Sequence, residues 1–218
     1  MGYVSTILPT ILEGGIISLK LFIVTLIFAL PLGLPICLGE NSRIAPIRWL
    51  CKTFVFVFRG TPLLLQLFFF YFFFPIQLGI RMEAFPTAAL TFIVNYAAYF
   101  AEIYRGGLKS IDQGQYEAAY SLGLSRIRTL FYIILPQMFR VVLPPVSNEV
   151  IVLIKDTALA SSIALAEIMR VSEGMVNRDG TLIPYVVAAM LYLLFTFLMT
   201  IVLGKVEKRY SRYDQKIA

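Results

Sequence analysis

The chain has 218 residues, of which 59% are hydrophobic and 15% are charged, and its mean hydropathy is +0.80. Soluble domains carry about 25% charged residues, and a soluble chain of this size could not hide so much apolar surface from water. The composition therefore excludes a disordered protein, a disulfide scaffold and almost any soluble enzyme. It indicates an integral membrane protein with one domain, over 1–218.

The formal net charge is +6, from 19 basic and 13 acidic residues. Basic residues collect on the cytoplasmic side of membrane proteins, so this excess indicates topology rather than nucleic-acid binding. The two cysteines, Cys37 and Cys51, do not have the spacing of a metal site. The absence of histidine excludes His-based proton relays, HExxH metalloproteases and Ser–His catalysis.

Four charge-free runs, each close to the length of about 20 residues that a membrane-spanning helix needs, are evident in the sequence. They cover 21–39, 60–80, 84–101 and 181–204. The stretch 130–154 is a weaker candidate, because it contains Arg140, Glu149 and three prolines. We expect the pair Pro144-Pro145 to break the helix near the middle of the membrane, since proline lacks a backbone donor.

Charge distribution favours counting this weaker stretch as a span. The segments that then lie inside hold 12 basic residues, and those that lie outside hold four. This asymmetry fits the positive-inside rule. We therefore predict an all-α integral membrane protein with its N-terminus outside and its C-terminus in the cytoplasm. Its five transmembrane helices are expected at 14–39, 54–74, 86–104, 130–154 and 182–204.

The inside segment 105–131 is too apolar for a simple solvated linker. Good helix formers predict a helix over 113–122, with Gly123 ending it and Ser125 capping a second helix. Tyr116, Ala119 and Tyr120 have the spacing of one helix face. Such a helix could seat in a groove on another protein or rest on lipid headgroups, and periodicity does not separate these alternatives.

Several motifs in this chain resemble a known family. Glu117-Ala118-Ala119, Gly123, Ile133 and Leu135-Pro136 have the spacing of the EAA signature of bacterial ABC-importer permeases. The stretch 58–67, FRGTPLLLQL, and the stretch from Tyr96 to Glu102 are similar to the polar-amino-acid permease family within it. The resemblance runs from about residue 14 to about 207, and it implies a MetI-like permease fold in the bacterial inner membrane.

The resemblance also implies a function and partners. The chain would be the membrane-spanning permease subunit of an ATP-driven importer for amino acids, and it would receive substrate from an extracytoplasmic binding protein. Its other partners would be ABC ATPase subunits, a second permease subunit (the same or homologous) and membrane lipid, with no nucleic acid. Residues Glu117, Ala118, Ala119 and Gly123 would couple the permease to the ATPase.

We expect no cofactor in this chain, because ATP and magnesium would be bound by the partner ATPase. The stretch 106–110 resembles a Walker loop only faintly, since Leu108 separates Gly107 from Lys109 and breaks the GxxxxGK[ST] spacing. The chain is therefore expected not to be an enzyme itself.

Polar residues in and near two spans are candidates for the substrate pathway, because an intramembrane charge is costly and is a functional hypothesis by default. The predicted pathway residues are Arg59, Asn148, Glu149, Lys155 and Asp156. Glu149 could bind a substrate ammonium or a basic side chain, or it could pair with Lys155 or with a neighbouring subunit. Arg59 could form a gate, pack between subunits or anchor the edge of a span. The aromatic run 68–74 is interpreted as packing or lipid-facing bulk rather than a substrate site.

Two other functions compete with this prediction. A secondary transporter that works alone usually shows internal repeats and more spans, and this chain shows neither. A membrane scaffold or an intramembrane enzyme is the third hypothesis, but no metal cluster or pair of catalytic carboxylates supports an enzyme.

Overall fold

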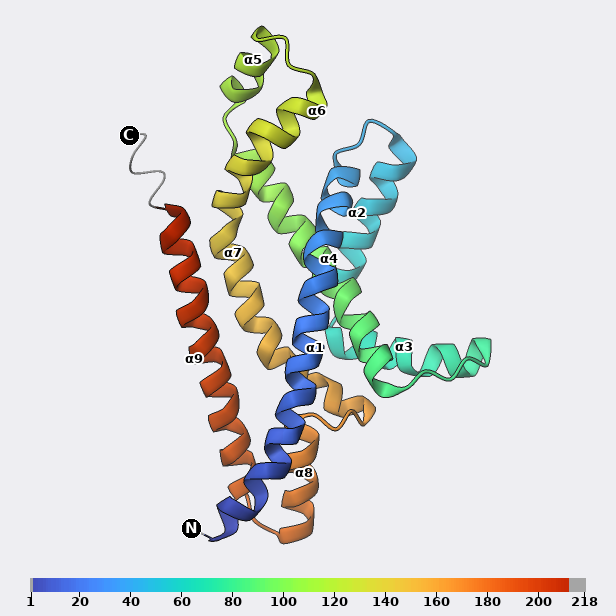
Figure 1. Cartoon of the computed structure of the whole chain (residues 1–218). Coiled ribbons are helices and arrows are strands. Elements are labelled where there is room, and N and C mark those ends of the chain that lie inside the picture. Colours follow the sequence, from blue (N-terminus) through green and yellow to red (C-terminus); the bar gives the residue numbers. More distant parts are fainter. Residues whose placement is uncertain (1, 212–218) are drawn as a thin grey trace.

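The computed structural model describes residues 2–211, and every element in this part of the chain is helical (Figure 1). In chain order the elements are α1 (Gly2–Glu40), α2 (Ala45–Gly60), α3 (Leu63–Leu78), α4 (Ala84–Ser110), α5 (Gln113–Ser121), α6 (Arg126–Thr129), the π-helical turn η1 (Leu130–Ile134), α7 (Leu135–Asp156), the 3-10 turn η2 (Thr157–Ile163), α8 (Ile168–Asp179) and α9 (Ile183–Ser211).

Four helical stretches in this part of the chain are long and apolar enough to cross a membrane, namely Gly2–Glu40, Ala84–Ser110, Arg126–Ile163 and Ile183–Tyr210. The predicted spans 14–39, 86–104, 130–154 and 182–204 each lie within or almost within one of them. The predicted span 54–74 does not form one straight helix. It is divided between α2 and α3, whose axes bend by 107°, and the pair together makes a fifth candidate span.

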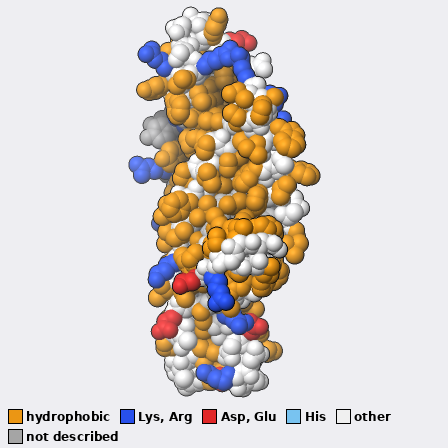
Figure 2. All heavy atoms as spheres, turned by 90° about the vertical axis from the view of Figure 1, so that its right-hand side faces the viewer, with side chains coloured by type: hydrophobic (Ala, Val, Ile, Leu, Met, Phe, Trp, Pro, Cys, Tyr) orange, Lys and Arg blue, Asp and Glu red, His pale blue; other side chains and the backbone are white. Residues whose placement is uncertain are grey.

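The start of α1 and α8 lie at one end of the molecule, whereas α5, α6 and the end of α9 lie at the other (Figure 1). This arrangement agrees with an odd number of crossings. Hydrophobic side chains dominate the middle of the face shown in Figure 2, and charged side chains gather towards its two ends. The side of the membrane that each end faces stays a prediction from charge. Two of the basic residues in that count, Arg212 and Lys216, lie outside the described residues.

Helix α4 forms the centre of the packing, and it contacts α1 along much of its length. Small residues on α4, including Ala97 and Ala101, are fully buried and allow the two helices to approach closely. A Cβ added to Gly33 of α1 would lie 2.8 Å from the Cβ of Phe100. The α1–α4 contact therefore depends on a glycine at this crossing.

Helix α7 corrects one prediction, because it continues through Pro144 and Pro145 without a break. The irregular turn lies earlier, at η1, where the N–H of Leu135 donates to the carbonyl of Leu130 with π-helical spacing. Pro136 follows directly and has no N–H to donate, so the regular hydrogen-bond pattern is interrupted here. After η1 the stretch stays α-helical up to Asp156, after which η2 begins, and η2 is followed by Ala164 in a left-handed conformation (φ 61°).

The predicted end of the helix over 113–122, which is α5 in the structure, is confirmed. Gly123 has φ +72°, its N–H donates to the carbonyl of Tyr120 (2.9 Å), and the N–H of Leu124 donates to Ala119 (3.0 Å). This pair of bonds is the Schellman motif that commonly ends a helix at glycine. The predicted cap of the next helix is also present, since the Ser125 side chain accepts a hydrogen bond from the N–H of Arg128 (3.4 Å).

A fully buried carboxylate, Glu167, joins three helices at the end of the molecule that includes α8. It caps α8 by accepting the N–H groups of Met169 (2.9 Å) and Arg170 (2.7 Å), and it accepts the hydroxyl of Tyr192 on α9 (2.8 Å). Ser18 of α1 contacts the same carboxylate at 3.5 Å. Burial raises the pKa of Glu167 above its usual range, while these donors act in the opposite direction.

Candidate functional site

A cavity of about 410 Å³ lies between the α2–α3 bend, α4 and α7. Its lining includes an arginine, two carboxylates and two tyrosines, namely Arg59, Glu149, Asp156, Tyr96 and Tyr99. Three of the five predicted pathway residues, Arg59, Glu149 and Asp156, are therefore brought together around one space. They come from two helices that are far apart in the sequence.

The bend between α2 and α3 is built by the FRGTPLLLQL stretch and forms one wall of the cavity. Thr61 precedes Pro62 and is extended (ψ 145°), which is the conformation that a following proline favours and which ends α2. The Gln66 amide donates to the carbonyl of Phe58 (2.9 Å) and to the hydroxyl of Thr61 (2.8 Å). These bonds satisfy groups that the end of α2 leaves without a helical partner.

Asn95 of α4 connects this bend to the helix bundle through side-chain hydrogen bonds. Its amide donates to the carbonyl of Phe58 (3.0 Å) and to the side-chain oxygen of Gln66 (2.9 Å). Gln66 is 7% exposed and Asn95 is 3% exposed, so both amides are removed from solvent and depend on each other.

Arg59 occupies the last turn of α2, where its positive charge complements the helix dipole. Its guanidinium lies 5.4 Å from the centre of the Tyr99 ring and 3.7 Å from Glu102 Oε1. Glu102 is also paired with Arg105 one turn later on α4. Arg59 thus stands between the cavity and this ion pair.

The two carboxylates on α7 have different surroundings. They are seven residues apart, which places them on the same helix face. Asp156 accepts a hydrogen bond from the hydroxyl of Tyr96 (2.7 Å). Glu149 is partly buried and has no hydrogen bond or ion pair with any residue of 2–211. Glu149 is therefore the carboxylate that is available to a ligand in the cavity.

The structure separates the other two predicted pathway residues from this cavity. Asn148 lines a different hollow, also about 410 Å³, between α7 and α9. Successive residues of a helix point about 100° apart, so Asn148 and Glu149 face different neighbours. Lys155 is exposed and does not line the cavity, and the described residues contain no ion pair between it and Glu149.

Sequence reasoning named the stretch that contains Tyr96 and Tyr99 but assigned these tyrosines no role at a site. Their spacing of three residues in a helix, directly before Glu102, was the signal that could have placed them on one face beside a charged group. Gln66 and Asn95 gave no such signal, because their partners are backbone groups at a bend that the sequence did not reveal.

The segment that contains Glu117, Ala118, Ala119 and Gly123 lies at the end of the molecule opposite to α8 (Figure 1). Glu117, Ala118 and Gly123 are exposed, whereas Ala119 is 1% exposed and packs inward. Tyr120, 83% exposed, lies on the outside of the same helix. The three residues predicted to share one helix face therefore do not share one environment, because Ala119 is buried while Tyr116 and Tyr120 are exposed.

Three large apolar side chains that follow α5 in the chain are also exposed. They are Leu122, Ile127 and Tyr132, all strongly exposed. A cluster of apolar residues on an end of the molecule that also carries charges is typical of a protein contact surface.

No group of three or more His, Cys, Asp or Glu residues in the described part of the chain is arranged to hold a metal ion. The candidate site therefore consists of the charged cavity and the exposed segment that includes α5.

These features define a class of membrane protein, a transport subunit with a charged cavity within its spans and an apolar contact helix at one end. The chain belongs to the family described as binding-protein-dependent transport system inner membrane component, whose model matches residues 26–212. The family resemblance predicted from the EAA signature is thereby confirmed.

Curated relatives cover nearly the whole chain. It is 42% identical over 209 residues to the L-cystine transport system permease protein TcyB of Bacillus subtilis, covering 94% of this chain and 89% of that protein. It is 36% identical to the arginine transport system permease protein ArtQ of the same organism, covering 95% of each. The glutamine permease GlnP of Escherichia coli is 33% identical, covering 93% of each.

Solved structures agree with this assignment. A crystal structure of an amino acid ABC transporter with histidines contains a chain that is 33% identical, with a TM-score of 0.89, covering 95% of this chain and 97% of that chain. An inward-facing structure of the MetNI methionine ABC transporter has a TM-score of 0.75 at 14% identity, covering 94% and 95%. The latter supports the fold alone.

Proposed function

We propose that this chain is the membrane-spanning permease subunit of an ATP-driven importer for amino acids. The observation that carries the proposal is the cavity in which Arg59 and Glu149 line the same space. An α-amino acid carries a carboxylate and an ammonium group separated by one carbon. A site with one guanidinium and one available carboxylate complements both charges.

In this proposal Arg59 binds the substrate carboxylate, because a guanidinium offers two parallel donors to the two oxygens. Glu149 binds the substrate ammonium. Asp156 is held by Tyr96 at 2.7 Å and so sets the shape and charge of the cavity wall. The ring of Tyr99 fixes the guanidinium of Arg59 from one side. Asn148 and Lys155 are not part of this contact set.

The proposal includes three kinds of partner. An extracytoplasmic binding protein delivers the amino acid, a second permease subunit completes the path, and ATPase subunits that hold ATP and magnesium drive the cycle. The N-terminus lies outside and the C-terminus in the cytoplasm. The segment with Glu117, Ala118, Ala119 and Gly123 docks on the ATPase, which its exposed apolar residues support.

The substitution Glu149→Gln tests the cavity. It removes one charge-assisted hydrogen bond, worth about 1.5–3 kcal/mol, which corresponds to a loss of about tenfold or more in apparent uptake affinity. The measurement is uptake of lysine, glutamine and glutamate into vesicles that contain the whole importer. All three should lose affinity if the partner is the α-ammonium, and lysine should lose most if the partner is a cationic side chain.

Glu173→Gln is the matched control, because Glu173 of α8 has a 42% exposed side chain that pairs with Arg170 away from the cavity. It should leave uptake unchanged. An importer with Glu149→Gln that assembles normally and takes up all three amino acids with unchanged affinity would remove Glu149 from the site.

The substitution Glu117→Lys tests the docking segment. Reversing the charge of this exposed residue should disturb a contact with the ATPase, so loaded binding protein should no longer raise ATP hydrolysis. Glu13→Lys makes the same change on an exposed residue of α1, the helix whose start lies at the other end of the molecule (Figure 1). Stimulation that is normal in the Glu117 variant would contradict this docking role.

A further inference from the structure

A buried carboxylate at the end of α1 takes no part in the cavity described above. Glu40 is the last residue of α1 and is 6% exposed. Its Oε2 atom has no hydrogen-bond partner within residues 2–211, and none of the ion pairs found there includes Glu40. The C-terminus of a helix carries a negative partial charge, which disfavours an anion. A carboxylate in this position therefore needs a cation that can reach it.

Charged side chains are present on both of the helices that pack against this end of α1, which are α2 and α4. Gly39 of α1 packs directly against Cys51 of α2. The side chains whose charges act on Glu40 are Glu102 and Arg105 of α4 and Lys52 and Arg59 of α2. Glu40 thus belongs to a group of charges that three helices share.

Arg105 is the cation of this group whose partner lies on its own helix. Its Nε donates to Glu102 Oε2 (2.8 Å), and its Nη2 contacts Oε1 of the same carboxylate. The two residues are three positions apart on α4, so their ion pair does not connect two helices. Arg59 of α2 approaches the same carboxylate, with its Nη1 3.7 Å from Oε1. Two arginines therefore compete for Glu102 while Glu40 stays without an ion pair in the described residues.

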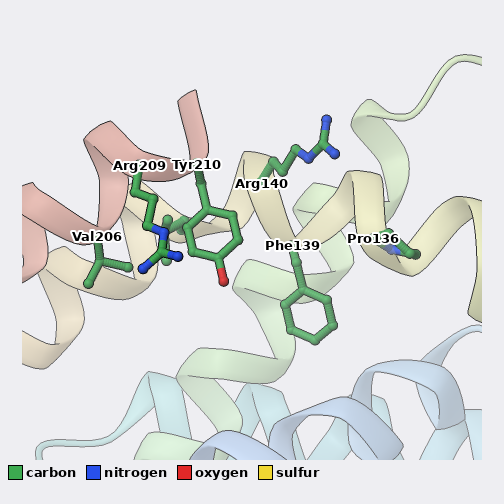
Figure 3. A pocket seen from close by; sticks show the side chains of 7 residues that line it. Pro136, Phe139, Arg140, Val206, Arg209 and Tyr210 are labelled. Atoms are coloured by element: carbon green, nitrogen blue, oxygen red, sulfur yellow. The ribbon is translucent and has the colours of Figure 1, made fainter. Parts of the chain in front are cut away.

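A larger hollow between α7 and α9, of about 870 Å³, does not hold a comparable set of charges. Arg140 and Arg209 both line it, but in Figure 3 the guanidinium group of Arg140 is directed away from that of Arg209. These two arginines therefore do not act on one group. Arg59 and Arg105, in contrast, share Glu102.

We propose that Glu40 is the second acceptor of Arg105, and that Arg105 moves between Glu102 and Glu40 during transport. The exchange rests on the proposed function, in which Arg59 binds the substrate carboxylate. A bound substrate engages Arg59, so Glu102 keeps Arg105. When the substrate leaves, Arg59 turns to Glu102, and Arg105 is released to Glu40.

The exchange changes how α4 is held in the bundle. The pair of Arg105 with Glu102 lies within α4, whereas a pair of Arg105 with Glu40 would join α4 to the end of α1. Arg105 lies in the last two turns of α4, which ends at Ser110 and is followed by α5 from Gln113. Glu40 is thus a positioning residue, through which the filling of the cavity sets the position of the end of α4 that leads to α5.

Thermal unfolding of the purified full-length chain in detergent tests the exchange without any substrate. Glu40→Gln alone should lower the melting temperature only slightly, because Arg105 stays with Glu102. In a Glu102→Gln background Arg105 turns to Glu40, so Glu40→Gln should lower the melting temperature by about twice as much or more. Equal shifts in the two backgrounds would overturn the proposal.

Glu13→Gln is the matched control, because Glu13 is an exposed residue of the same helix. Its effect should be the same in both backgrounds. If the Glu102→Gln variant fails to fold, Glu102→Asp keeps the charge but shortens the side chain. The effect of Glu40→Gln should then also be larger than in the wild type, by a smaller factor.

Whole importers in vesicles test the role in transport. Glu40→Gln should lower the maximal rate of uptake and the stimulation of ATP hydrolysis by loaded binding protein. The KM for the amino acid should stay unchanged, since Glu40 does not line the cavity. Glu40→Asp keeps a carboxylate and should restore part of both rates. A Glu40→Gln importer that only assembles in smaller amount, with normal rates per assembled complex, would show a merely structural role and would overturn the proposal.

Failure of this proposal and failure of the cavity contacts give different results. Unchanged uptake by the Glu149→Gln importer would disprove the cavity contacts, but it would not alter the unfolding shifts expected for Glu40. Equal unfolding shifts of Glu40→Gln in the wild-type and Glu102→Gln backgrounds would disprove the exchange, whatever the Glu149 variant does.

Discussion

Single side chains decide the shape of the cavity, and Gln66 is the clearest case. Its amide nitrogen contacts the carbonyls of Phe58 and Thr61 and the Thr61 hydroxyl, and its amide oxygen accepts from Asn95. A buried amide with this many partners satisfies several groups at once, so removing it leaves more than one of them unpaired.

We therefore expect Gln66→Leu to destabilise the protein by about 2–4 kcal/mol, from the buried groups that lose a partner. The measurement is thermal or denaturant unfolding of the purified chain in detergent. The same variant should also reduce uptake, because Arg59 lies in the last turn of α2, directly before the bend, and would lose its position.

Gln77→Leu provides the comparison for this test. Gln77 is an exposed residue of α3, so the same chemical change should alter stability by less than about 0.5 kcal/mol. Equal stability of the two leucine variants would show that the bend does not depend on the Gln66 network.

At the scale of helix pairs, α1 and α4 approach closely at Gly33. An added methyl group would meet the Cβ of Phe100 at 2.8 Å and the backbone nitrogen of Ala101 at 3.1 Å. Neither atom can move without moving α4, so the crossing tolerates no side chain here.

Gly33→Ala should consequently cost about 1–3 kcal/mol of stability, although alanine is the better helix former. The control is Gly106→Ala on α4, where an added Cβ meets nothing within 4 Å. That variant should be neutral or gain up to about 1 kcal/mol. Unfolding measured for both in the same detergent checks the pair, and a Gly33 variant as stable as the wild type would disprove a tight crossing.

The helices that the sequence predicted well are those with local signals. Gly123 and Ser125 act through groups within a few residues, so the end of α5 and the cap of α6 could be placed without knowing the fold. The pair Pro144-Pro145 misled the prediction for the opposite reason. A proline removes its own donor, but neighbouring helices and side chains decide whether the helix continues, as it does in α7.

The cavity was predictable only in part, again for a physical reason. A charge within a span is conspicuous in a sequence, so Arg59, Glu149 and Asp156 could be named. Which of them share a space depends on how α2, α4 and α7 are rotated against one another, and the sequence contains no direct signal for that. Asn148 was grouped with Glu149 because the two residues are adjacent in the sequence, although Asn148 faces α9.

The orientation of the whole molecule in the membrane is the remaining prediction from charge. The start of α1 and the end of α9 lie at opposite ends of the structure, and α8 lies at the end opposite to α5 (Figure 1). With the positive-inside rule, α8 should face the outside and α6 the cytoplasm.

Single cysteines at positions 177 and 126, in a background with Cys37 and Cys51 replaced by alanine, test this orientation. Both Asn177 and Arg126 are exposed. A membrane-impermeant maleimide is added to spheroplasts, whose inner membrane is intact. It should label position 177 at once and position 126 only after the membrane is permeabilised. Labelling of both positions from the same side would exclude an odd number of crossings between them and would contradict the predicted five spans.

The sharp bend between α2 and α3 also has a mechanical consequence. Helix α3 extends sideways from the bundle (Figure 1). Gln66 and Leu67 near its start are buried, whereas Phe69, Phe72 and Phe73 farther along are exposed. Sixteen residues make it ~24 Å long at about 1.5 Å per residue. Pivoting it by about 10° about the bend would carry its free end through roughly 4 Å, whereas Arg59 and Gln66, close to the pivot, would hardly move. Any such rotation of α3 would be centred on this bend. The hydrogen bonds of Gln66 and Asn95 that fix the cavity wall therefore also set the angle between α2 and α3.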